Sequence, residues 1–451
     1  MSTPRAHPAR PRAARGLATE HAPPLDLPLR FFLVALGGCA VLAGAAPWQL
    51  SLLLGSFYDP RLLAFVHVNT LGIIGATVLG ASYQLVPVVL QTALPSVRLA
   101  RLSWWLYVPG LLALLAGLGG GGPVLLGAGG SLLAAAVVLY AGVLLGAFCR
   151  AEERDVVFWH LALALAGLVL AAGLGALLAH SKSQGLLGAS TLPVLAAHAV
   201  LMVGGWVTPM ITGVAYRLVG MFTLSEEQLR AEWAWAELGL TVGGAWLLAA
   251  SLLGGWARPV GLFAAAALGA GQLLFALQLL RLYRLRRRRT FDLHIPFALA
   301  ACAAGLVAAG LMVLGLASAR PPADPLWLAA GWLAIAGWAE TAIQGFLYKI
   351  GPFLTWLRRY APVAGRQPVP KLEDLYGRHI ALLGWACWVG GVALAAMATL
   401  LQVAPLAPLG GVLLSAGLVA FLVNAVRVGL HWRAPRPLAG PTPVPPGRTV
   451  R

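Results

Sequence analysis

The sequence predicts an all-α, polytopic membrane protein whose twelve transmembrane helices form three pseudo-repeated four-helix arcs. Apolar residues make up 59% of the 451-residue chain and charged residues only 10%, which is more apolar surface than a water-soluble domain can bury. The apolar runs are continuous, and this favours helices over barrel strands because lipid cannot satisfy open backbone groups. A Gly-x-x-Tyr motif that recurs at almost equal intervals along the chain indicates an internal repeat: Gly80/Tyr83, Gly213/Tyr216 and Gly345/Tyr348.

Twelve apolar runs are long enough to cross the hydrocarbon layer, which takes about 20 helical residues. We expect a basic, disordered cytoplasmic leader at 1–29, a transmembrane domain at 30–431 and a Pro- and Arg-rich cytoplasmic tail at 432–451. The repeat units are expected at about 25–155, 156–290 and 291–431. The predicted spans cover 30–54, 62–90, 104–121, 123–148, 157–180, 188–215, 235–255, 259–280, 294–316, 326–350, 379–401 and 406–430.

The repeat extends beyond the Gly-x-x-Tyr helices. The stretch LDLPLRFFL at 25–33 matches FDLHIPFAL at 291–299, which places Asp26 and Asp292 two repeat periods apart. In the middle unit, His160 is predicted to correspond to His294, about one period later. Each unit holds an even number of helices, so the three copies share one orientation and spans 2, 6 and 10 are expected in equivalent places.

Basic residues predict the orientation in the membrane. With the N-terminus inside, the outer loops hold four of the 32 Lys and Arg residues, which leaves 28 on the cytoplasmic side. This asymmetry follows the positive-inside rule, so we expect both termini in the cytoplasm, as in a protein of a bacterial-type inner membrane. The net charge of +17 is then explained by contact with anionic lipid and requires no nucleic acid. The four outer residues are Arg61, Lys182, Arg258 and Arg320.

Two histidines within spans are the main candidates for cofactor ligands. His67 lies about 8 Å and His198 about 15 Å below the outer ends of spans 2 and 6, at 1.5 Å per helical residue. A polar group at such depth needs a partner. Neutral imidazole binds haem iron and copper, so both residues are candidate cofactor and metal ligands. The alternative is an imidazole bonded to a neighbouring carbonyl, with Asn69 nearby.

Further polar residues add secondary candidates. His180, at the outer end of span 5, and Met202, four residues after His198, are possible additional metal ligands. The competing interpretations are an interfacial residue for His180 and packing for Met202. Glu340 lies deep in span 10, so we interpret it either as a proton or coupling site or as a neutral carboxyl group bonded to a neighbouring helix.

Other polar residues are assigned structural roles. His160, His294 and His379 stand at the cytoplasmic ends of spans and are expected to be interfacial. The tyrosines of the Gly-x-x-Tyr motif are expected in an aromatic belt at the inner membrane surface. The four cysteines are isolated in the sequence, so we expect small buried thiols rather than disulfides.

The architecture resembles the heme-copper oxidase subunit I superfamily. His67-x4-Gly72, then Gly80 and Val86-Pro87, is similar to NnrS-type haem- and copper-containing membrane proteins. The resemblance implies haem b, with copper as a further candidate, and a haem ligand at His67 with His198 or His180 as its partner. In that superfamily span 10 supplies two haem ligands and spans 6 and 7 supply three histidines. Here span 10 has no histidine and span 7 lacks a His-His pair, so we expect no competent terminal oxidase.

Three functional hypotheses follow from these features. The first is a haem- or copper-binding membrane protein in electron transfer, nitric oxide response or haem and copper homeostasis. The second is a proton-coupled transporter that uses Glu340. The third is a non-catalytic membrane subunit or assembly factor. A respiratory or redox partner would then dock on the basic run from Arg281 to Arg289 and the polar segment from Pro352 to His379, and membrane lipid is the partner common to all three.

Overall fold

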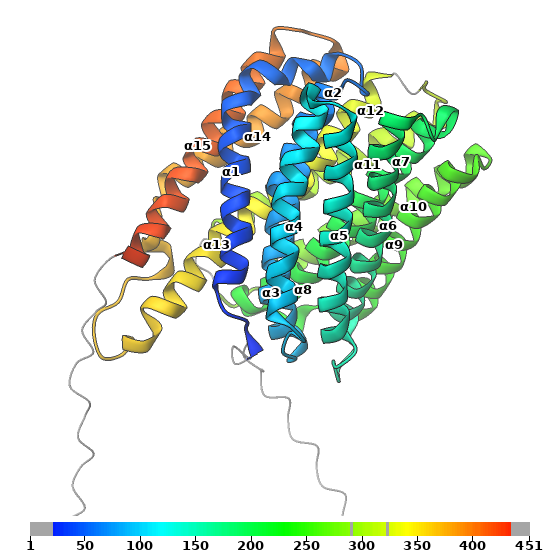
Figure 1. Ribbon diagram of the computed structural model, residues 1–451. Helices are drawn as coiled ribbons and strands as arrows, with labels where there is room; N and C mark the ends of the chain where they lie inside the picture. The colour runs from blue at the N-terminus through cyan, green and yellow to red at the C-terminus, as the bar shows by residue number, and fades with distance from the viewer. Residues whose placement is uncertain (1–20, 289–291, 322–323, 434–451) are drawn as a thin grey trace, which may run out of the picture.

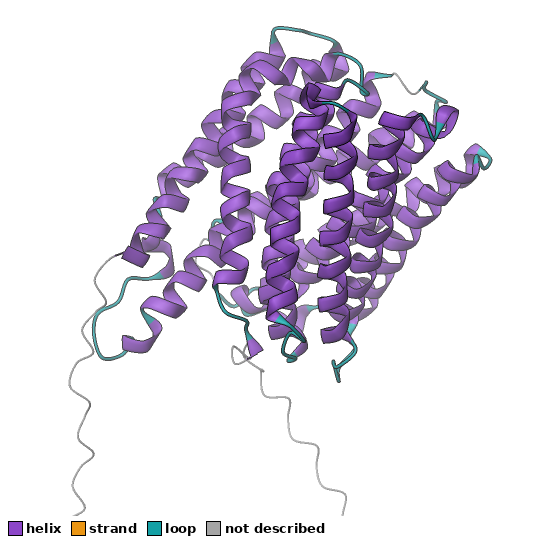
Figure 2. Ribbon diagram, in the orientation of Figure 1, coloured by secondary structure: helices purple, strands orange, loops and turns teal. Residues whose placement is uncertain are grey.

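The computed structural model describes residues 21–288, 292–321 and 324–433. Within these ranges, twelve helices are long and apolar enough to cross a membrane, which confirms the predicted number of spans. Short loops connect the helices (Figure 2). Most of the predicted leader and tail lies outside the described residues. The described chain begins and ends on the same side of the bundle, as an even number of spans requires (Figure 1).

The spans agree with the predicted ranges except at several inner ends. The third span begins at Val97 rather than at residue 104. The tenth continues to Arg359, so the predicted polar loop from Pro352 to His379 is wrong over its first eight residues, which are helical. The helices are α1 (Asp26–Gln49), α2 (Pro60–His67), α3 (Ala76–Leu90), α4 (Val97–Ala116), α5 (Pro123–Phe148), α6 (Val156–Gln184), α7 (Thr191–Val200), α8 (Thr208–Thr223), α9 (Ala231–Gly254), α10 (Arg258–Arg284), α11 (His294–Ala317), α12 (Pro325–Trp332), α13 (Thr341–Arg359), α14 (Arg378–Leu401) and α15 (Leu406–Arg433). Short 3₁₀ turns are η2 (Leu50–Leu54), η5 (Gly188–Ser190), η7 (Glu226–Gln228), η9 (Ala361–Val363) and η10 (Leu372–Leu375).

Of the twelve spans found in the described residues, nine form an outer ring around three inner ones. Successive outer helices pack against each other within a repeat unit, as α4 does on α5, α9 on α10 and α14 on α15. The units join through α5 with α6, α10 with α11, and α15 with α1, which closes the ring. The second, sixth and tenth spans are the most enclosed of the described helices: 61%, 61% and 72% of their apolar windows are buried, against 33–50% elsewhere. The predicted equivalence of these three spans is therefore visible in their burial.

Each inner span contains a π-helical segment at the same place in the repeat. The segments are η3 (Val68–Gly75), η6 (Leu201–Val207) and η8 (Leu333–Glu340), and their first residues are spaced as the Gly-x-x-Tyr motifs are. η8 packs against both η3 and η6. The wide turn of a π-helix leaves carbonyl groups without their usual partner. Side chains supply it: the Tyr107 hydroxyl donates to the Leu71 carbonyl at 2.7 Å, and the Thr341 hydroxyl donates to the Ala336 carbonyl at 2.8 Å.

Small residues allow the first helix of each unit to touch the π-helical segment. Gly38, Gly167 and Ala304 face Gly72, Gly205 and Gly337 respectively. The approach is closest in the middle unit, where a Cβ on Gly167 would lie 2.1 Å from the Gly205 carbonyl oxygen. Backbone contact of this kind is how helices associate where lipid supplies no hydrophobic drive.

Aromatic triads mark the inner half of the three units. Each triad takes one ring from the first, second and fourth helix of its unit, with neighbouring ring centroids 5.1–5.9 Å apart. The tyrosines are at most 7% exposed, so the predicted aromatic belt is wrong and these rings belong to the core. The triads are Phe31–Tyr83–Tyr140, His160–Tyr216–Phe275 and Phe297–Tyr348–Phe421.

The triads also correct the predicted register of the middle unit. His160 occupies the place of Phe31 and Phe297, not that of His294. The aspartate five residues before each ring starts its helix, as Asp155 does by accepting a hydrogen bond from the Phe158 backbone at 2.9 Å. A constant repeat period wrongly pairs His160 with His294, because the stretch that joins the first two spans of the middle unit is longer by about one helical turn.

Candidate functional site

His67 ends α2 and directly precedes η3. Asp59 caps the start of α2 by accepting from the Arg61 backbone N–H at 2.8 Å, and Pro60 occupies the first turn. The His67 Nδ1 lies 2.7 Å from the Leu63 carbonyl oxygen, one turn earlier. A carbonyl can only accept, so Nδ1 carries the proton and the Nε2 lone pair remains available. The His67 Nε2 has no hydrogen-bond partner within the described part of the chain.

His198 repeats this arrangement on the sixth span. It lies in α7 one turn before η6, and its Nδ1 is 2.8 Å from the Ala171 carbonyl oxygen of α6. Gly175 of α6 makes room for the ring, because a Cβ there would lie 2.9 Å from the imidazole Cε1. The tautomer is again the one with a proton on Nδ1 and a lone pair on Nε2. The ligand and carbonyl-bonded interpretations are therefore compatible, since each uses a different nitrogen.

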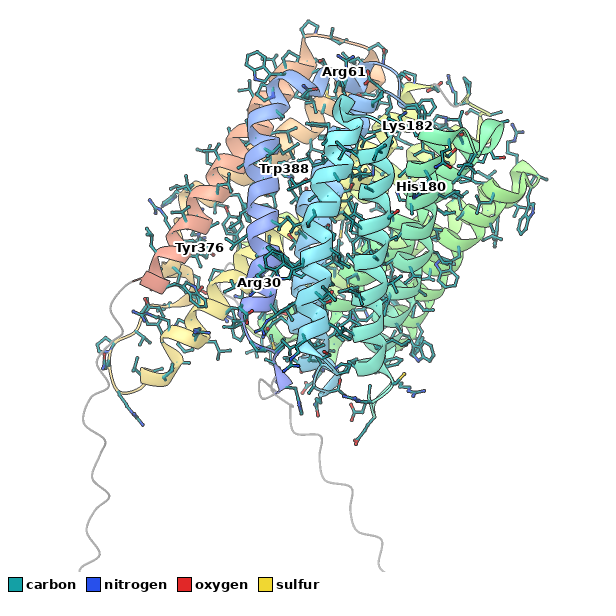
Figure 3. All side chains as sticks on the ribbon, viewed as in Figure 1. Arg30, Arg61, His180, Lys182, Tyr376 and Trp388 are labelled. Carbon is teal, nitrogen blue, oxygen red and sulfur yellow. The ribbon has the colours of Figure 1, made fainter. Side chains whose placement is uncertain are left out.

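The structure places His67 and His198 on two of the three inner spans, each shortly before a π-helical segment, whereas the further ligand candidates have other surroundings. His180 is bonded instead to the Ser131 hydroxyl at 3.0 Å, between α5 and α6 (Figure 3). Met202 is half-buried in η6, one turn beyond His198. Across residues 21–288, 292–321 and 324–433, no three His, Cys, Asp or Glu side chains gather as a metal cluster.

The residues fit a two-imidazole centre in their donor chemistry. Two neutral histidines with a fixed Nδ1–H and an open Nε2 form a donor set that either haem iron or copper would accept. The backbone carbonyls of Leu63 and Ala171 act as the outer partners that orient such ligands. The centre would contain two protein ligands, fewer than the oxygen-reducing site of an oxidase requires.

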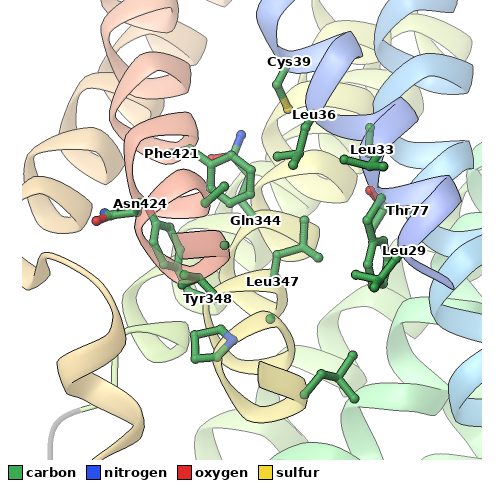
Figure 4. A pocket seen from close by; sticks show the side chains of 18 of the residues that line it. Leu29, Leu33, Leu36, Cys39, Thr77, Gln344, Leu347, Tyr348, Phe421 and Asn424 are labelled. Atoms are coloured by element: carbon green, nitrogen blue, oxygen red, sulfur yellow. Dashed lines mark hydrogen bonds between the residues drawn. The ribbon is translucent and has the colours of Figure 1, made fainter. Parts of the chain in front are cut away.

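A cavity of about 320 Å³ lies apart from the histidines, between α1, α3, α13 and α15. Figure 4 shows Leu29, Leu33 and Leu36 of α1 along one wall and Phe421 of α15 on another. Its polar lining includes Thr77, Gln344 and Asn424, and neither His67 nor His198 lines it. The cavity is therefore apolar space near the inner half of the first and third units, separate from the imidazole pair.

Glu340 lies where η8 meets α13 and is completely buried. The Gln344 amide donates to its Oε1 at 3.3 Å, and Gln344 in turn lines the cavity. Neither Glu340 Oε2 nor the two side-chain polar atoms of the neighbouring Asn69 has a hydrogen-bond partner of good geometry in the described residues. Asn69 therefore belongs beside Glu340 rather than His67, and the site leaves donors and acceptors open to a proton or water.

Glu237 is a second buried carboxyl group, and the sequence did not predict it as a site residue. Glu237 of α9 accepts hydrogen bonds from the His160 Nε2 at 2.8 Å and the Tyr216 hydroxyl at 3.1 Å, both on its Oε2. The Thr241 hydroxyl donates to its Oε1 at 3.0 Å. His160 and Glu237 are both 0% exposed, so the interfacial role predicted for His160 is wrong. The shared spacing Asp-x4-Phe/His at 26–31, 155–160 and 292–297 could have shown that His160 occupies a core position.

His294 is also buried rather than interfacial. It is 2% exposed, and its Nδ1 lies 3.0 Å from Asp292 Oδ1. Lys349 of α13 forms an ion pair with the other oxygen of Asp292. Burial alone would raise the pKa of Asp292, but the contacts with His294 and Lys349 outweigh it and hold that pKa below its ordinary value. His379 is exposed at the start of α14, as predicted.

Comparison with known proteins identifies the fold. No protein-family model and no curated protein matches the sequence. Among the solved structures, 39 chains match. One is the structure of a heme-copper terminal oxidase dimer, which aligns with a TM-score of 0.67 over 92% of this chain and 84% of that chain, at 10% sequence identity. The likeness at this identity establishes the fold alone: this is a multi-pass membrane protein with the subunit I-like fold of heme-copper oxidases.

Proposed function

We propose that this chain holds a haem b or copper centre at His67 and His198 and functions in electron transfer, without the activity of a terminal oxidase. The observation that carries the proposal is the matched tautomer of the two histidines. Each donates Nδ1–H to a backbone carbonyl, at 2.7 Å and 2.8 Å, and leaves Nε2 without a protein partner. A histidine that served packing alone has no need of an open ring nitrogen at membrane depth.

The protein would position and enclose the centre. The carbonyls of Leu63 and Ala171 fix the two rings, and the π-helical segments that follow each histidine hold them on inner, enclosed spans. The bound metal would supply a one-electron redox couple. A haem held by both imidazoles would supply electron transfer rather than binding of a diatomic ligand. Nitric oxide response and haem or copper homeostasis are the alternative roles, and nitric oxide titration of the purified protein separates them.

Metal analysis and an absorbance spectrum of the pure protein test this proposal. We expect haem b or copper in the wild type and at least a tenfold lower affinity in His67→Ala and in His198→Ala, because removing a ligand exceeds the outer-partner effect of about 10–100-fold. His180→Gln should retain the metal, as should the exposed control His379→Gln. A folded wild-type protein that takes up neither haem nor copper when both are supplied would refute the proposal.

Glu340 favours a second candidate function, proton-coupled transport. The supporting observation is a fully buried carboxyl group with an open oxygen beside the unpartnered amide of Asn69. Gln344 connects this group to the cavity. Proton uptake by proteoliposomes should then be lost in Glu340→Gln, and uptake equal to the wild type in this variant would exclude the function.

The inner face is the proposed contact surface for a redox partner or assembly partner. In the structure, the segment after α13 packs back on the bundle: the Trp356 indole donates to the Pro370 carbonyl at 2.8 Å, and Tyr360 bonds His431 at 2.7 Å. Together with the basic run from Arg281 to Arg289, whose last residue lies outside the described part of the chain, this segment would present a cationic surface beside anionic lipid. Cytoplasmic termini and a bacterial-type inner membrane are part of the same proposal.

A further inference from the structure

The middle repeat contains a closed hydrogen-bonded cluster of ionisable groups in the inner half of the bundle. His160 of α6, Tyr216 of α8 and Glu237 of α9 meet there, with Thr241 one turn beyond Glu237. All four residues are at most 3% exposed. The His160 Nδ1 donates to the Val156 carbonyl at 2.7 Å, so its Nε2 is directed at Glu237.

The fold does not require this cluster, because the other two units do without it. The place of His160 is taken by Phe31 and Phe297. The corresponding tyrosine hydroxyls have neutral partners: Tyr83 donates to Ser103 at 2.8 Å, and Tyr348 accepts from Asn424 at 3.4 Å. A buried ion pair seldom stabilises a protein more than apolar packing does. An ionisable pair confined to one of three equivalent places therefore indicates a role other than stability.

We propose that His160 and Glu237 form a reversible proton-binding site of the middle repeat. In its neutral state the pair shares one proton between the His160 Nε2 and the Glu237 Oε2. Uptake of a second proton forms an O–H bond on the Glu237 Oε1 and leaves His160 as imidazolium, so the charge of the pair rises by one. Release of that proton restores the neutral pair.

Every hydrogen-bond donor of the cluster has an acceptor in both protonation states, so the site can take up and release a proton without losing a hydrogen bond. In the neutral state Tyr216 and Thr241 both donate to the carboxylate. After proton uptake, the Glu237 Oε1–H donates to the Thr241 hydroxyl oxygen, and Thr241 can rotate to donate to the backbone carbonyl one turn earlier. The His160 bonds to Val156 and to Glu237 Oε2 persist. No buried polar atom is orphaned by the transfer.

Further titratable side chains lie between the cluster and the inner surface. Cys302 of α11 lies near both Tyr216 and Tyr283 of α10. The Tyr283 ring is tilted against the His294 ring, with centroids 5.7 Å apart, and His294 contacts Asp292, whose side chain is 12% exposed. Tyr216 and Cys302 are thus the titratable groups that face the His160–Glu237 pair from the helices packed around it.

Infrared difference spectroscopy of the full-length protein in lipid nanodiscs tests the proposal without requiring a metal. We expect a carboxylic C=O band that grows as the pH is lowered, because proton uptake converts the Glu237 carboxylate into a carboxylic acid. Glu237→Gln should abolish this band. Glu232→Gln is the matched control: it removes an exposed carboxyl group from the same helix, α9, and should leave the titrating band unchanged.

Two further variants separate proton binding from a structural contact. In His160→Phe, Glu237 loses its partner and should stay protonated, so the band should be present at every pH. Thr241→Val keeps the pair but removes the hydroxyl group that bonds Glu237 Oε1 in both protonation states, so the titration of the band should differ from that of the wild type. A Glu237 band that is constant over the whole range in the wild type, or a Thr241→Val titration identical to it, would overturn the proposal.

Discussion

The first and middle repeats fill equivalent places in the core with side chains of different chemistry. In the first, the Phe31 ring covers Tyr83, whose hydroxyl bonds Ser103. In the middle one, His160 covers Tyr216 and both bond Glu237. The rings take equivalent places in both units, so a single scaffold accommodates either an apolar contact or an ionisable pair. The difference shows that the repeat determines where these side chains lie, whereas the residue at each position determines whether a unit contains an ionisable pair.

The largest expected effect comes from turning the middle triad into the first. His160→Phe alone leaves the Glu237 carboxyl buried without its main partner, which should lower the free energy of unfolding by about 3–5 kcal/mol. The double variant His160→Phe/Glu237→Gln replaces the carboxyl group with an amide, which needs no proton to stay neutral, and should recover most of this loss. Unfolding titrations in detergent micelles measure both. A double variant as unstable as the single one would show that the two units are not interchangeable scaffolds.

A smaller effect is expected where the first helix meets the π-helical segment. Gly167→Ala places a methyl group 2.1 Å from the Gly205 carbonyl oxygen, and the required helix shift should cost about 2–3 kcal/mol. Gly173→Ala on the same helix is the matched control, because no atom lies within 4 Å of the added Cβ. The third unit already carries Ala304 at this place. Equal stability of the two variants would mean that the middle unit is no more tightly packed than the third.

The sequence was sufficient for the architecture because membrane spans and repeats are periodic signals. The length of each apolar run predicts a helix, and the Gly-x-x-Tyr spacing predicts which spans are equivalent. It also singled out His67, His198 and Glu340 as polar residues within apolar helices, and the structure places them on the three inner spans.

The contacts between distant helices could not be predicted in the same way. The pairing of His160 with Glu237 joins residues 77 positions apart, and the position of His160 near a helix end suggested the membrane surface instead. The π-helical turns could not be predicted either, because the wider turn of a π-helix changes no recognisable pattern in an apolar sequence. The separation of the cavity from the histidines likewise depends on how α1 packs against α13 and α15.

An aspartate near the start of the first helix in each unit allows the same comparison at the inner surface. Replacing it is expected to have the smallest effect on stability. Asp26 pairs with Arg101 while 39% of its side chain is exposed, whereas Asp292 pairs with Lys349 and His294 at 12%. Asp292→Asn should therefore lower the free energy of unfolding at pH 7 by about 2 kcal/mol, and Asp26→Asn by less than about 1 kcal/mol.

The pH dependence of this difference follows from the lowered pKa of Asp292 in the folded protein. A depressed pKa contributes stability that is fully present above the ordinary Asp value of about 3.9 and is lost as the pH falls through the folded value. The gap between wild type and Asp292→Asn should consequently be constant from about pH 7 to 5 and narrow in stronger acid. Unfolding titrations at several pH values measure it, and a gap that widens on acidification would mean that the Lys349 and His294 contacts do not stabilise the ionised carboxyl group.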